Sequence, residues 1–173
     1  MAYGLVSLAA VALGFVAAPS GSSGEDVLSR HFGRPGDCWL RAYDAEHLSR
    51  NPAQRVTRFD LARTYGQTEA GPEPNPPGEV HLALRARTRG GTAPLTGLGI
   101  CLEESATVAE ARCGIESDGG GFRLQPSGQG LRLTADARAI LSFGDGPSID
   151  LGQRLEDRVI ELARAPASVC ADQ

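Results

Sequence analysis

Residues 113–125, CGIESDGGGFRLQ, place three consecutive glycines between an acidic segment and an alternating apolar segment. An Asp-Gly pair between two alternating runs is a strong hairpin signal, because a type I′ turn needs positive φ at its central residues. We therefore predict a turn at Asp118-Gly119 between two short strands. Gly120 and Gly121 would then permit a β-bulge or the close approach of another backbone.

The same glycines could instead belong to a phosphate or calcium loop. A phosphate loop is disfavoured because no GK[ST] motif is present and a strand pattern, not a helix, follows. A calcium loop needs more oxygen ligands than Glu116 and Asp118 provide. The second glycine–acid loop, at 143–150, is also interpreted as a turn, although Asp145 and Asp150 could share a cation with the first loop if their tips meet.

Period-2 alternation recurs along the chain and predicts many short strands separated by Gly and Pro signals. This pattern indicates an all-β fold, a mostly antiparallel sandwich or barrel, with one or two short helical turns at 44–51 and 27–32. Segment 103–112 fits either a helix or a hairpin connection, and we favour the hairpin. The expected strands are 37–43, 55–65, 79–88, 95–103, 111–116, 121–125, 131–135, 138–143 and 158–163.

Residues 24–173 are expected to form one β-rich domain, with residues 66–78 as an exposed Pro/Gly loop between two strands. Residues 1–23 resemble a secretory signal peptide, because 2–18 are uncharged and apolar and small residues follow. The alternative is an uncleaved anchor, although a membrane span needs about 20 apolar residues. Both interpretations predict export, to the periplasm or beyond, or attachment to the membrane through residues 2–18.

Four cysteines, an even number, agree with an oxidising compartment. Three pairings are possible, and we favour Cys101–Cys113 across a short hairpin, which leaves Cys38–Cys170 to join the first strand to the C-terminal tail. Zinc is disfavoured because no CxxC motif occurs and the three histidines lack finger spacing. No cofactor is expected.

The net charge of −4 argues against general nucleic-acid binding, which needs a strongly basic surface. All basic residues are arginines, and Arg85, Arg87 and Arg89 follow one another at period 2 on the outward face of one strand. Such a row is typical of a solvated strand face paired with acids across the sheet. It could also dock an anionic partner, with guanidinium groups about 7 Å apart.

Candidate chemical groups are few. Asp44, Glu46 and His47 could act as an acid–base or metal cluster, but Asp44 is more simply the N-cap of a helical turn. No GxSxG motif occurs, and disulfide-bonded cysteines cannot act as nucleophiles. Trp39 and Tyr43 share one face of the first strand and could form a ligand-stacking platform, although such pairs more often pack in a core.

Two blocks, CWLRAYDAEHL at 38–48 and CGIESDGGGF at 113–122, resemble a set of uncharacterised exported bacterial proteins. The resemblance implies no activity and no site residues. The expected role is a non-catalytic binding or accessory module of the bacterial envelope, whose partner is a protein, a glycan or a small ligand. The alternatives are a small periplasmic hydrolase or metal-dependent enzyme, and a structural domain held by an uncleaved N-terminal helix.

Overall fold

A computed structural model describes residues 25–68, 71–142 and 146–171. Eight antiparallel strands close into a barrel, because β9 pairs with both β8 and β11. Of the two architectures expected from the sequence, the barrel is therefore correct and the sandwich is not. The barrel strands are β1 (Cys38–Ala42), β2 (Val56–Thr64), β5 (Glu79–Thr88), β6 (Leu95–Leu102), β7 (Ala111–Ile115), β8 (Gly120–Ser127), β9 (Gly130–Ser142) and β11 (Val159–Ala165).

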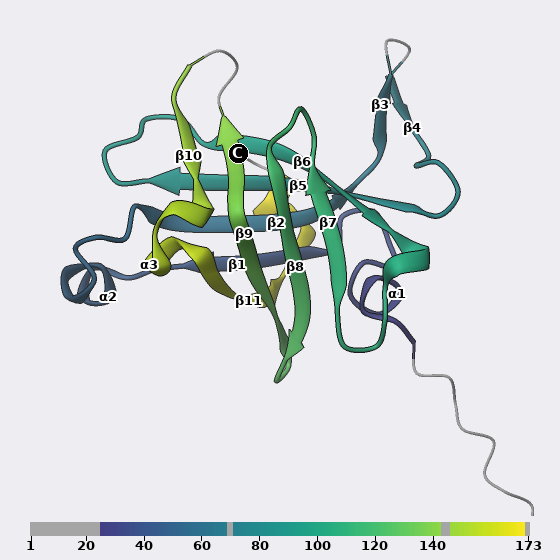
Figure 1. The fold of residues 1–173 in the computed structure, drawn as a ribbon, viewed down its shortest axis with the longest axis horizontal. Helices are drawn as coiled ribbons and strands as arrows, with labels where there is room; N and C mark the ends of the chain where they lie inside the picture. Colours follow the sequence, from purple (N-terminus) through teal and green to yellow (C-terminus); the bar gives the residue numbers. More distant parts are fainter. Residues whose placement is uncertain (1–24, 69–70, 143–145, 172–173) are drawn as a thin grey trace, which may run out of the picture.

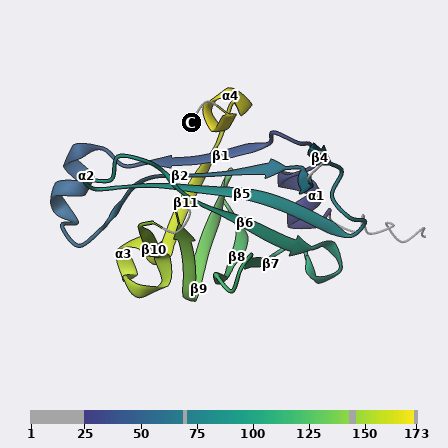
Figure 2. The ribbon, with the colours of Figure 1, turned by 90° about the horizontal axis from the view of Figure 1, so that it is seen from above.

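Strands that are neighbours in the barrel are also neighbours in the sequence, apart from short insertions and from the pairing of β1 with β11, which joins the two ends of the chain. In Figure 1 the strands β1, β2 and β5 run across β7, β8 and β9, and Figure 2 shows these two sets as the opposite walls of the barrel. Short β10 (Ser148–Asp150) extends the sheet at β9. The remaining elements are α1 (Val27–His31), α2 (Ala45–Arg50), η1 (Glu103–Ser105), η2 (Leu151–Gln153), α3 (Leu155–Arg158) and α4 (Ala167–Ala171).

Alternating side chains pack the inside of the barrel. Trp39, Phe59, Leu82 and Phe122 are among the largest side chains in one continuous buried core. At one end of the molecule α1 adds Val27 and Leu28 to this core, and the following Phe32 joins them. Eight strands enclose a space just wide enough for side chains to fill.

The hairpin between β7 and β8 lies where the sequence predicts it, but its turn is one residue earlier. Ser117 and Asp118, not Asp118 and Gly119, have positive φ, and the Gly119 N–H donates to the Glu116 carbonyl at 3.3 Å. Gly120 is needed for another reason, because the backbone of β9 approaches it closely. A Cβ on Gly120 would lie 2.0 Å from the Arg138 carbonyl oxygen, at the β-bulge between β8 and β9.

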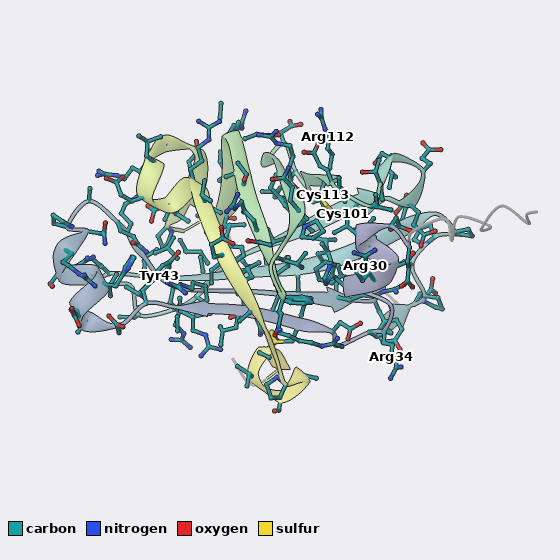
Figure 3. All side chains as sticks on the ribbon, turned by 90° about the horizontal axis from the view of Figure 1, so that it is seen from below. Arg30, Arg34, Tyr43, Cys101, Arg112 and Cys113 are labelled. Atoms are coloured by element: carbon teal, nitrogen blue, oxygen red, sulfur yellow. A yellow bond between two sulfur atoms is a disulfide. The ribbon has the colours of Figure 1, made fainter. Side chains whose placement is uncertain are left out.

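Both disulfides form with the favoured pairing. Cys101 and Cys113 face each other across β6 and β7 inside the barrel, which confirms a hairpin connection and not a helix over 103–112 (Figure 3). Cys38 and Cys170 join β1 to α4 on the outside (Figure 2). Two disulfides agree with an oxidising, extracellular or periplasmic location.

The proline-rich segment is not a simple loop. Residues 66–73 contain a two-stranded hairpin, β3 (Gly66–Thr68) with β4 (Gly71–Glu73), which projects from the barrel in Figure 1. The expected strands 131–135 and 138–143 form one long strand, β9. The predicted signal peptide or anchor at 1–23 lies outside the described residues. In the described part of the chain, no helix has the length and apolar character needed to span a bilayer.

Candidate binding groove

The expected acid–base cluster at α2 has structural contacts. Asp44 is the N-cap, and its carboxylate accepts from the His47 backbone N–H at 2.7 Å. His47 Nε2 lies 2.9 Å from Gln54 Oε1, and its ring stacks on Tyr43. Glu46 pairs with Arg50 on the exposed side of the helix. These contacts hold α2 against the barrel, and no second acid converges on His47 among the described residues.

The two glycine–acid loops do not form a cation site among the described residues. Asp150 accepts hydrogen bonds from the backbone N–H groups of Ala139 and Gly152, each at 2.9 Å, so it fixes the connection after β10. Asp145 lies outside the described residues. Within the described ranges no group of three His, Cys, Asp or Glu side chains could hold a metal ion.

The arginine row is engaged within the chain at both of its ends. The Arg85 Nε lies 2.7 Å from Oδ2 of the buried Asp60, the cross-strand neighbour of Arg85 on β2. Arg89 lies beyond the end of β5 and donates to the carbonyl oxygens of Gln54, Leu48 and Asn51. Arg87 is exposed. The row therefore does not present three equivalent guanidinium groups to a partner.

Trp39 and Tyr43 do not form an open platform. Trp39 is 2 % exposed, donates from its indole nitrogen to the His31 carbonyl at 3.1 Å, and packs against Phe32. Tyr43 is half-buried beside α2, at the opposite end of the molecule from Arg30 of α1 (Figure 3). Burial raises the pKa of the Tyr43 hydroxyl, and the nearby Arg41 guanidinium offsets only part of this increase.

A groove lies on the outer face of β5 and β6, where no sequence motif indicates a site. Its floor contains Ala83 of β5 and, directly opposite on β6, Leu98, with Ile100 next on the same face. The volume of the groove is about 760 Å³, within the range of pockets that bind ligands. Ala83 is small between the longer His81 and Arg85 on the same face of β5.

Opposite walls of the groove carry one carboxylate each. The β3–β4 hairpin and the segment after it contribute Glu73, Pro74 and Pro76, and the β7–β8 turn contributes Glu116 and Ser117. Glu73 and Glu116 are exposed, and within the described part of the chain neither has an ion-pair partner. With His81 they are the ionisable side chains lining the groove, so its charge is negative.

His81 is the most constrained polar group of the groove. It is 8 % exposed, and its Nε2 lies 2.8 Å from Oε2 of Glu79. Because a carboxylate accepts hydrogen bonds, this contact places a proton on Nε2. Nδ1 is buried and has no hydrogen-bond partner. His81 therefore contributes an unpartnered ring nitrogen beneath the wall of the groove.

Two smaller hollows continue the groove across the barrel wall. One, about 390 Å³, shares Ile100 with the groove and lies over Gly114, where a Cβ would meet nothing within 4 Å. The other, about 370 Å³, shares Ala83 and Thr64 and reaches α4. The outer surface is thus depressed from β2 to β7. Sequence alternation gives the outward direction of Ala83, but only the register shows that Leu98 and Ile100 lie beside it.

Comparison with protein-family models, curated proteins and solved structures gives no match to this chain. The class that the structure defines is a disulfide-bonded, eight-stranded antiparallel β-barrel with a packed interior and a grooved outer wall.

Proposed function

We propose that this chain is an exported, non-catalytic binding protein of the bacterial envelope, and that its partner binds in the groove on the outer face of β5 and β6. The observation that carries the proposal is the combination of an apolar floor, Ala83 with Leu98 and Ile100, with polar groups that have no partner at its walls. Ligand-binding surfaces combine these two features, because apolar area supplies affinity and a few polar groups fix orientation.

Three further observations support export and a non-catalytic role. The apolar, uncharged residues 2–18 agree with a secretory signal, and both disulfides need oxidising conditions to form. Among the described contacts, the side chains of His47 and His81 bond to Gln54 and Glu79, and no histidine is hydrogen-bonded to a side-chain hydroxyl. Side chains occupy the barrel interior, whereas wider barrels can hold a ligand there. We therefore favour a ligand bound on the outer wall.

Filling the groove tests the proposal. The mature protein and its Ala83→Phe variant are coupled to beads, crosslinked to an envelope extract of the producing cells, and analysed by mass spectrometry for proteins and small molecules. Ala163→Phe is the matched control, because Ala163 is an exposed alanine on the outer face of β11.

We expect one stoichiometric partner on the parent protein and on the Ala163→Phe variant, and its loss on the Ala83→Phe variant. Equal recovery on all three baits would place binding elsewhere on the barrel. No recovery on any bait would contradict a binding role.

A further inference from the structure

We propose, on the basis of the binding function proposed above, that the groove recognises an extended peptide segment in which an arginine lies beside aliphatic side chains. The proposal names the chemistry of the partner and follows from three properties of the groove. These are its shape, its unpaired hydrogen-bond acceptors, and its negative charge.

The shape favours a polypeptide over a compact molecule. The row of outward residues Thr64, His81, Ile100 and Gly114 crosses β2, β5, β6 and β7 in register. Three interstrand spacings amount to about 14 Å, which an extended segment of about five residues would span. The depression follows this row, since the two smaller hollows adjoin the groove at either side.

The hydrogen-bonding groups of the groove require a donor. His81 lines the groove and is 8 % exposed, and its buried Nδ1 has no hydrogen-bond partner. Glu73 and Glu116 only accept, and neither has a cation beside it among the described residues. A peptide backbone supplies N–H groups, and a guanidinium group supplies five more in a planar fork that matches carboxylates.

Charge complementarity selects a cation over a neutral or anionic segment. The described lining of the groove contains two carboxylates and no arginine, whereas the neighbouring hollow over Gly114 has its charges compensated internally. There Arg123 lies between Glu110 and Asp136, and Arg112 pairs with Glu110 at 2.9 Å. Uncompensated negative charge is therefore concentrated between the β3–β4 hairpin and the β7–β8 turn. The aliphatic side chains of the peptide would pack on Leu98 and Ile100.

The direct test uses a defined probe, the fluorescein-labelled pentapeptide Leu-Arg-Leu-Gly-Leu with a C-terminal amide. Its partner probe replaces arginine by citrulline, which has nearly the same shape without the charge. Binding is measured by fluorescence anisotropy, with protein concentrations up to 1 mM, for the parent chain and for the double variant Glu73→Gln/Glu116→Gln. Glu156→Gln is the control, an exposed glutamate of α3 that does not line the groove.

We expect the citrulline probe to bind about tenfold more weakly than the arginine probe, since exposed ion pairs each contribute only modestly. The Glu73→Gln/Glu116→Gln variant should bind both probes equally, at the weaker affinity, and the Glu156→Gln variant should retain the tenfold preference. High salt should reduce the preference, because exposed charges are screened.

Two different results separate a failure of the peptide inference from a failure of the proposed binding function. If the parent chain binds both probes equally, the groove does not select a cation. If the Ala83→Phe variant then binds neither probe, the groove is still the binding site. No binding of either probe up to 1 mM would overturn the peptide inference, whereas the capture experiment with the Ala83→Phe variant separately decides the function.

Discussion

At the scale of single residues, the glycine cluster that begins β8 is a packing requirement. Gly120 has a φ of +86°, and any side chain there would collide with the Arg138 carbonyl of β9. Gly114, one strand away, has ordinary backbone geometry and open space around its Cα. These two glycines therefore form a matched pair for substitution.

We expect Gly120→Ala to lower the free energy of unfolding by at least about 2 kcal/mol, because strain and overpacking each cost about 1–3 kcal/mol. Gly114→Ala should be neutral or slightly stabilising, since glycine in a strand costs entropy. Urea denaturation of both variants checks this. An unfolding free energy of Gly120→Ala close to that of the parent would contradict the close approach of β8 and β9.

His31 links stability to pH. Burial, with the nearby Arg30 and Arg164 guanidinium groups, holds the pKa of His31 below its usual value of 6.5 in the folded protein. The unfolded state therefore binds a proton first as pH falls, so His31 costs no stability above about pH 6.5 and reduces the free energy of unfolding below it. We expect His31→Gln to make unfolding less dependent on pH between about 6.5 and 5.

Thermal unfolding of the parent chain and the His31→Gln variant across this pH range is the measurement. Identical pH profiles would show that other groups determine the loss of stability at low pH.

At the scale of elements, a buried carboxylate fixes short α3 to the start of β2. Asp157, 1 % exposed, accepts from the Val56 N–H at 2.9 Å and from the Arg55 N–H at 3.1 Å, and pairs with the Arg55 guanidinium at 3.3 Å. This contact joins residues about a hundred positions apart in sequence. It also satisfies two backbone donors that would otherwise be buried without an acceptor.

We expect Asp157→Ala to destabilise the protein by roughly 3 kcal/mol, the cost of leaving buried donors and a cation without their acceptor. The neighbouring Glu156→Ala, at an exposed position, should change stability by less than about 0.5 kcal/mol. Denaturant unfolding of both variants distinguishes them. A small effect at Asp157 would mean that water replaces the carboxylate at no cost.

The two disulfides should contribute unequally. Cys38 and Cys170 are 132 residues apart, whereas Cys101 and Cys113 are 12 apart. In the chain-entropy model the longer loop gives about 5 kcal/mol and the shorter about 3 kcal/mol. We therefore expect Cys38→Ala/Cys170→Ala to lower the melting temperature more than Cys101→Ala/Cys113→Ala.

Calorimetry of the two double variants makes this comparison. The reverse order would show that packing of Cys101 and Cys113 in the core outweighs the loop entropy.

At the scale of the whole molecule, local patterns predicted most barrel strands and the Cys101–Cys113 pair, because alternation and close cysteine spacing are properties of short segments. Cys38–Cys170 followed only as the remaining pair. Alternation over 79–88 reproduces β5, and the short spacing between Cys101 and Cys113 indicates the β6–β7 hairpin. Barrel or sandwich could not be decided, since closure depends on β9 pairing with β8 and β11.

The groove could not be predicted from the sequence for a related reason. Ala83 and Leu98 belong to different strands, and only their register places them side by side. The sequence could not show that Arg85 and Arg89 are engaged within the chain, because their acceptors, Asp60 on β2 and the carbonyls after α2, come from other elements. Small outward residues in adjacent strands are the one signal that could have suggested a hollow.

The central claim is that the partner binds on the outer wall over β5 and β6, and chemical-shift mapping tests it most directly. The uniformly ¹⁵N-labelled mature protein is titrated with the arginine pentapeptide, and amide shifts are followed by two-dimensional NMR. We expect the largest shifts at His81, Leu98, Ile100 and Gly114, with little change in α2 and α3. A peptide that causes no shifts would overturn the peptide inference alone, whereas shifts confined to α2, α3 or the β11 face would contradict the claim.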